Sequence, residues 1–213
     1  MRPTFLLGAV AAGLLIPAAA NAQFTNGGFE SGDFTGWTIT PTSNGTTTVQ
    51  QVVSFDIDGP GPLGSSLSAQ FSVGRTSGTT TGNHGIELTQ MLSLVGGVQY
   101  TFGFNWAATR TTSSTNSQGG IFDLIVDGTS LANAAAGSTS STAPHYGSLS
   151  ANFTPGSTGS YSVGARITRP FTVPSPATLF QNVDNFSMLA VPEPATLAVL
   201  GLGAAAMLRR RKK

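Results

Sequence analysis

Few residues in this chain could carry out chemistry. It contains two histidines, His84 and His145, and no cysteine. The lack of thiols excludes disulfides, thiolate metal sites and cysteine nucleophiles. Both histidines stand among turn-forming residues, so we expect them to face solvent in loops. The sequence shows no HExxH, G-x-S-x-G or P-loop pattern, and it therefore predicts a protein that is not an enzyme.

Acidic side chains are the remaining candidates for a site. A glycosidase needs two carboxylates that face each other across the bond to be cleaved. Asp123 and Asp127 instead flank a strand and a turn, while Asp56 and Asp58 share an Asp-x-Asp-Gly-Pro-Gly segment. That segment resembles part of a calcium loop but lacks the downstream ligands of one. We expect a solvated turn there.

Charge divides the chain into two basic ends and an acidic middle. Six of the ten Lys and Arg residues lie at the ends, at Arg2 and in the run 209–213. Between Gln23 and Val191 the four remaining bases are outnumbered by eight acids, which gives this segment a net charge of −4. A basic patch for phosphate backbones is missing, so we expect no nucleic-acid partner.

The first 22 residues have the three parts of a secretory signal peptide. Arg2 supplies the positive charge, Phe5–Ile16 is apolar, and Ala20-Asn21-Ala22 offers small side chains for signal peptidase. The apolar run is short for a membrane span, so a permanent anchor is the weaker alternative. We expect a signal helix over residues 1–22 and a mature protein that begins at Gln23.

The last 23 residues, Val191 to Lys213, also form a tripartite segment. Pro192-Glu193-Pro194 ends the preceding domain, an uncharged run over 197–208 follows, and five bases close the chain. The 14 residues from Ala195 to Leu208 would span about 21 Å as a helix at ~1.5 Å per residue, which is short for a ~30 Å hydrocarbon core. The pattern predicts a hydrophobic helix that anchors the chain only marginally.

This tail resembles the PEP-CTERM sorting signal, which is also called the ice-binding protein C-terminal domain. The resemblance rests on the sorting motif Pro192, Glu193 and Pro194, the apolar helix and the basic cluster. It implies recognition by an exosortase-type membrane transpeptidase in a bacterium that makes extracellular polysaccharide. It also implies an intermediate held in the inner membrane by the C-terminal helix, followed by delivery to the cell surface or matrix. A plain C-terminal anchor is the alternative.

Between the ends, apolar and polar residues alternate in short runs separated by Gly, Ser, Thr, Asn and Pro. Tyr100, Phe102, Phe104 and Trp106 illustrate the period of two. This pattern predicts an all-β domain over 23–190, folded as an antiparallel β-sandwich. We expect loops at Thr111–Gly120 and Ala132–Pro144, and strands near 37–40, 46–55, 68–75, 85–94, 99–109, 119–127, 146–153, 160–168 and 179–189.

Segments of this domain resemble carbohydrate-binding-module-like jelly rolls with the galactose-binding-like fold. The sequence NGGFE at 26–30 and FTGW at 34–37 resembles the family's first strand. Val98–Phe104 resembles its core strand and Val183–Met188 its closing strand. The resemblance implies that the first and last strands are adjacent.

The same resemblance implies a structural calcium ion beside these strands, with Glu30 and Asp184 as its carboxylate ligands. Hard oxygen ligands without His or Cys suit Ca²⁺. The alternative is that Glu30 caps a turn and that Asp184 accepts hydrogen bonds from nearby backbone N–H groups.

Aromatic residues are the usual platforms for sugar recognition. We expect Trp37 and Trp106 to belong to the core, which leaves Tyr146 and Phe171 as exposed candidates. Three interpretations remain: a non-catalytic surface or matrix module that binds polysaccharide, a purely structural surface protein, and an ice-binding protein. Consecutive threonines such as 46–48 point to opposite faces of a strand and build no flat threonine ladder, which argues against the third.

Overall fold

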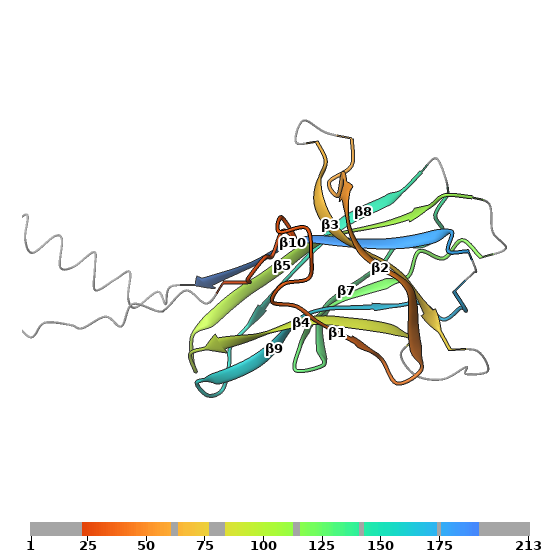
Figure 1. Ribbon diagram of the computed structural model, residues 1–213. Helices are drawn as coiled ribbons and strands as arrows, with labels where there is room; N and C mark the ends of the chain where they lie inside the picture. The colour runs from red at the N-terminus through yellow and green to blue at the C-terminus, as the bar shows by residue number, and fades with distance from the viewer. Residues whose placement is uncertain are drawn as a thin grey trace, which may run out of the picture.

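The computed structural model describes residues 23–60, 64–76, 84–112, 116–140, 143–173 and 176–191. Within these residues the regular structure consists of strands, and the expected signal and C-terminal helices lie outside them. The strands, drawn in Figure 1, are β1 (Thr38–Pro41), β2 (Gly45–Phe55), β3 (Ser66–Arg75), β4 (Gly85–Leu94), β5 (Gln99–Arg110), β6 (Ile121–Val126), β7 (Thr129–Ala135), β8 (His145–Phe153), β9 (Gly159–Thr168) and β10 (Leu179–Val191).

The strands form two five-stranded sheets packed face to face. One sheet has the order β1-β4-β9-β6-β7 and the other has the order β2-β3-β10-β5-β8. Neighbouring strands of both sheets pair antiparallel. The antiparallel β-sandwich expected from the alternation is therefore confirmed, and each of the nine expected strands corresponds to an observed one.

The core lies between the sheets, where the inward residues of each strand meet. On β5 the inward residues are Tyr100, Phe102, Phe104 and Trp106, and all four are buried. Burial of large aromatic side chains supplies much of the favourable free energy of folding. The expected core positions of Trp37 and Trp106 are confirmed.

The segment that precedes β1 closes one end of this core with aromatic rings. Phe24 stacks on Trp37 with ring centroids 5.5 Å apart, and Trp37 lies 4.5 Å from the ring of Phe186 on β10. The expected first strand is absent here, because residues 25–32 form turns. One backbone hydrogen bond, from Phe186 N–H to Gly27 O at 2.9 Å, joins this segment to β10. The last strand pairs instead with β3 and β5.

Strand β7 was not expected, since Ala132–Pro144 reads as a loop in the sequence. Its small residues show no apolar alternation, and β7 forms by pairing with β6 across the Asp127-Gly128 turn. Both turn residues have positive φ, 46° and 73°, which is the geometry of a tight hairpin. Tertiary pairing thus overrides weak local preference.

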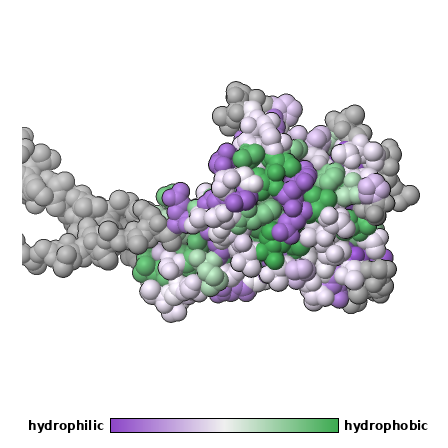
Figure 2. All heavy atoms as spheres, in the orientation of Figure 1, coloured by the Kyte–Doolittle hydropathy of each residue, from purple (hydrophilic) through white to green (hydrophobic). Residues whose placement is uncertain are grey.

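In the part of the chain that the structure describes, no helix is long and apolar enough to cross a membrane. On the visible surface, apolar residues gather over the region where β2 runs (Figure 2). The half-buried Val53 and Phe55 lie on the outer face of that strand, whereas Val52 between them packs against the core. The outer face of this second sheet is therefore partly apolar, which bears on the site described next.

Candidate functional site

Asp184 occupies an irregular point of β10. The register of β10 against β5 shifts between Asp184 and Ser187, and Asn185 within this bulge has a φ of 56°. A bulge re-aims the side chains beside it. Asp184 ends up fully buried, where it accepts hydrogen bonds from Ser66 Oγ at 2.8 Å and from the N–H of Asn185 at 2.7 Å.

Glu30 reaches the same place from the turn before β1. A Cβ atom on Gly28 would lie 3.7 Å from Glu30 Cγ and 3.8 Å from Asp184 Oδ1, so the Glu30 side chain and the Asp184 carboxylate border one point. Glu30 also accepts a long hydrogen bond of 3.4 Å from the N–H of Leu67. The adjacent Phe29 has a φ of 54°, an uncommon conformation for a bulky residue. Strained backbone of this kind is concentrated at functional sites.

Burial changes the acidity of Asp184. Removal from water is the largest effect, and together with the nearby charges of Glu30 and Asp58 it raises the pKa of Asp184 to about 6. The hydrogen bonds from Ser66 and Asn185 act in the opposite direction. A proton or a cation would therefore relieve the electrostatic cost of this carboxylate.

The oxygen atoms that the structure brings together here are the Asp184 carboxylate, the Ser66 hydroxyl and the nearby carboxylate of Glu30. Hard oxygen donors suit Ca²⁺, which accepts carbonyls and hydroxyls beside carboxylates. No group of three or more His, Cys, Asp or Glu side chains is placed to hold a metal in the described segments. A calcium ion here would thus depend on neutral oxygens for most of its shell. The type of these donors, though not their number, is the one that Ca²⁺ prefers.

A pocket of about 350 Å³ opens on the outer face of the sheet that contains β5 and β8. Its lining consists of Ile57, Asp58, Asn105, Tyr146, Gly147 and Ser148. Asn105 and Ser148 are register partners on β5 and β8 and point away from the core, opposite to Phe104 and Trp106. Ile57 and Asp58 belong to the turn between β2 and β3.

That turn folds over the sheet face and meets β8, although β2 and β8 are the two edge strands. Phe55 stacks near Tyr146 with ring centroids 6.4 Å apart and an interplanar angle of 27°. Asn105 Nδ2 donates a 2.7 Å hydrogen bond to Asp58 Oδ1. A Cβ atom on Gly59, whose φ is 79°, would lie 3.2 Å from the ring of Tyr146. The strap Phe55–Gly59 therefore forms one wall of the pocket.

A row of side-chain amides crosses the sheet toward this pocket. The register aligns Gln51, Gln70, Asn182, Ala107 and Tyr146 on five successive strands. Gln51 Nε2 donates to Gln70 Oε1 at 2.8 Å, and Gln70 Nε2 donates to Asn182 Oδ1 at 3.1 Å. The Nδ2 of Asn182 is buried without a hydrogen-bond partner. An unsatisfied buried amide is costly, so a polar group placed beside it would be stabilised.

The other sequence candidates have different places. His84 is buried, with 6% of its surface exposed, which corrects the expectation of a solvent-facing loop: its carbonyl accepts from the N–H of Arg169 beside the paired strands β4 and β9. His145 is exposed at the start of β8, and Phe171 is exposed beside Arg169. Tyr146, an expected exposed aromatic, is half-buried and lines the pocket.

Asp58 is the site residue that the sequence did not reveal. Its segment was expected to be a solvated turn, and Asp58 is indeed exposed, but the turn is brought against β5 and β8. The only local signal was the Asp-x-Asp-Gly spacing, which does not predict that this turn contacts β5 and β8. The contact depends on sheet curvature and on the pairing of distant strands.

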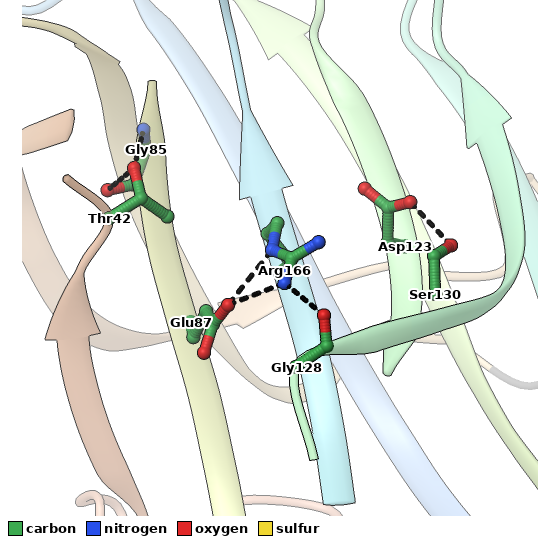
Figure 3. A network of polar contacts seen from close by, with 7 residues as sticks. All are labelled: Thr42, Gly85, Glu87, Asp123, Gly128, Ser130 and Arg166. Carbon is green, nitrogen blue, oxygen red and sulfur yellow. Dashed lines mark hydrogen bonds and ion pairs between the residues drawn. The ribbon is translucent and has the colours of Figure 1, made fainter. Parts of the chain in front are cut away.

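Carboxylates on the opposite sheet are engaged in a structural network (Figure 3). Arg166 on β9 forms an ion pair with Glu87 on β4, with Nη2 and Oε1 2.7 Å apart, and also donates to the Gly128 carbonyl. Asp123 accepts a 2.7 Å hydrogen bond from Ser130 Oγ across the β6–β7 hairpin. These cross-strand contacts tie neighbouring strands together.

The sandwich resembles several solved carbohydrate-binding modules. TmCBM61, solved in complex with β-1,4-galactotriose, is 17% identical, with 78% of this chain and 97% of that chain covered and a TM-score of 0.46. The CBM22-1 xylan-binding domain of Paenibacillus barcinonensis Xyn10C is 15% identical, with 78% and 92% covered and a TM-score of 0.44. A CBM4 structure is 15% identical, with 79% and 99% covered and a TM-score of 0.46. At these identities the likeness is one of fold.

A comparison with curated proteins gave no match. Residues 190–212 match the family model of the PEP-CTERM protein-sorting motif. The matched range contains Pro192, Glu193 and Pro194, which lie outside the described residues. The chain therefore carries a PEP-CTERM sorting motif, which indicates export and exosortase-dependent sorting to the cell surface.

Proposed function

We propose that this chain is an exported, non-catalytic surface or matrix protein whose domain, residues 23–190, binds extracellular polysaccharide. The observation that carries the proposal is the pocket beside Tyr146. It combines an aromatic ring with an amide, a hydroxyl and a carboxylate, which are the groups that hydrogen-bond to sugar hydroxyls. Its volume of about 350 Å³ is within the range of small-ligand sites.

The amide row extends this proposal across the sheet. Sugar rings present an apolar face and a rim of hydroxyl groups, so an aromatic ring with polar neighbours suits them. Asn182 Nδ2 and Ser68 Oγ are buried donors without partners. Asn182 and Ser68 have no exposed surface, so a glycan that extends along this row from Tyr146 would contact its exposed Gln51 and half-buried Gln70. The alternative is a purely structural surface protein.

Delivery follows from the two ends of the sequence. In this proposal signal peptidase removes residues 1–22, and the segment 191–213 holds the chain in the inner membrane by its apolar helix. An exosortase-type transpeptidase then acts near Pro192-Glu193-Pro194 and releases the domain to the surface or matrix. The match to the sorting motif over 190–212 supports this order of events.

Calcium is the proposed structural cofactor. Glu30 and Asp184 would hold the ion beside the bulge of β10, and the raised pKa of Asp184 supports a carboxylate that needs a positive partner. When bound, the ion would neutralise these charges and pin the turn before β1 to the sheet. It would stabilise the fold and take no part in chemistry.

A glycan array probed with the mature chain tests the polysaccharide proposal. We expect binding to at least one class of oligosaccharide, and we expect Tyr146→Ala to weaken it at least tenfold by removing the stacking surface. Phe171→Ala is the matched control, because Phe171 is an exposed aromatic residue away from the pocket. Absence of binding across the array would favour the purely structural alternative, and equal loss in both variants would contradict the assignment of binding to the pocket.

A further inference from the structure

The pocket beside Tyr146 is acidic. Asp58 lines it and is exposed, and Asp56 stands close enough to raise the pKa of Tyr146, after the larger effect of burial. Asp56 Oδ1 is buried and has no hydrogen-bond partner among the described residues. The carboxylate of Asp58 therefore lines the pocket, and that of Asp56 lies near its tyrosine.

The bases of the domain lie elsewhere. Arg110 is five residues from Asn105 along β5, which corresponds to about 17 Å at ~3.3 Å per residue. Arg75 lies at the far end of β3, paired with Gly45 at the opposite end of β2 from the strap. Arg166 belongs to the other sheet and is paired with Glu87, and Arg169 follows β9. The arginines of the described residues therefore lie away from Asp58, and the titratable groups nearest to the pocket are Asp56, Asp184 and His145.

From this arrangement we infer that the pocket selects a polysaccharide that carries free amino groups, such as a chain of β-linked hexosamine units. This inference rests on the proposed polysaccharide function. An ammonium group beside Asp58 gains from the carboxylate, and the face of the Tyr146 ring attracts cations as well. A uronate or a sulfate in the same position is repelled.

Four β-1,4-linked hexasaccharides separate the charge of the sugar from its shape: glucosamine, N-acetylglucosamine, glucose and glucuronic acid. Isothermal titration of the mature chain is carried out at pH 6, in 20 mM salt and at a fixed calcium concentration, conditions chosen so that the amines are charged. We expect the glucosamine chain to bind at least tenfold more tightly than the two neutral chains, and the glucuronic acid chain to bind most weakly. Because exposed charges are screened, 0.5 M salt should reduce this preference.

Asp58→Asn tests the residue that carries the selectivity. The variant keeps the size of the side chain and an oxygen for Asn105, and we expect it to lose the preference for glucosamine over the neutral chains. Asp127→Asn is the matched control, since Asp127 is an exposed acid at the β6–β7 turn of the other sheet. Melting curves of both variants check folding, and Asp56→Asn replaces Asp58→Asn if the latter fails to fold.

The outcomes distinguish the two proposals. Equal binding of glucosamine and neutral chains, or a preference that survives Asp58→Asn, would overturn the inference and leave the polysaccharide function standing. Failure to bind any of the four chains or any glycan of the array would overturn both the polysaccharide function and the preference for amino groups. An oligolysine of equal charge that binds as tightly as the glucosamine chain would show that the pocket responds to charge alone, which also overturns the assignment to a glycan.

Discussion

Asp184 keeps a carboxyl group where water is excluded, and its acidity shifts accordingly. Its pKa is raised to about 6 from an ordinary value of 3.8, chiefly by burial. The folded chain then binds more protons than the unfolded chain between these two values, so this group favours folding below pH 4 and loses that contribution as the pH rises through 6. The difference corresponds to about 3 kcal/mol at ~1.36 kcal/mol per pH unit.

We therefore expect the mature chain in EDTA to lose stability between pH 4 and pH 7, and calcium to restore it at pH 7 but not at pH 4. A ligand of the folded state at a hundredfold excess over its Kd adds about 2.7 kcal/mol. Thermal melts of the wild type and of Asp184→Asn measure both effects, and the variant should lose both. Asp123→Asn, on the other sheet, should keep them. If EDTA leaves the melting temperature at pH 7 unchanged, the calcium proposal is contradicted.

Strand pairing could be predicted only where the sequence alternates. β4, β5 and β9 show the period of two, because one face of each meets the core. β7 is built from small residues, and its pairing with β6 depends on a positive-φ hairpin that no alternation reveals. The segment before β1 resembled a strand, yet its turns serve to bring Phe24 and Phe29 onto Trp37.

The sequence could predict one part of the candidate site, the pair Glu30 and Asp184, but not the other part, the pocket with its strap. Glu30 and Asp184 could be named from the sequence, because the resemblance to a family already paired them. The position of the strap Phe55–Gly59 could not be predicted, because its contact with Tyr146 joins the two edge strands of one sheet. The predicted exposure of His84 was wrong, because the turn residues beside it in the sequence do not reveal its contact with Arg169 after β9.

Packing between β5 and β8 depends on a glycine that also lines the pocket. A Cβ atom on Gly147 would lie 2.5 Å from the buried ring of Trp106, which is itself stacked on Phe122 with centroids 4.7 Å apart. Overpacking of this kind costs about 1–3 kcal/mol. We expect Gly147→Ala to lower the free energy of unfolding by that amount in urea titrations.

Gly156→Ala provides the control for this prediction, because a Cβ atom on Gly156 would meet nothing within 4 Å. The control variant should match the wild type to within about 0.5 kcal/mol, as most surface substitutions do. If Gly147→Ala were as stable as Gly156→Ala, the position of Trp106 beneath β8 would be wrong, and with it the shape of the pocket floor.

At the scale of the whole molecule, sorting and binding use separate parts of the chain. The sorting motif occupies residues 190–212 and begins where β10 ends. The pocket lies on the outer face of the sheet β2-β3-β10-β5-β8, while the other sheet carries the network of Glu87, Arg166 and Asp123. A domain built in this way can be released from its tail without loss of its site.

The central claim is that this outer sheet face binds polysaccharide. Titration of the ¹⁵N-labelled mature chain with a glycan found on the array, followed by NMR, locates the contact residue by residue. We predict the largest amide shifts at Asn105, Tyr146, Gly147 and Ser148, with Glu87 and Arg166 on the other sheet unchanged. Shifts confined to the other sheet, or an unchanged spectrum at saturating glycan, would contradict the claim.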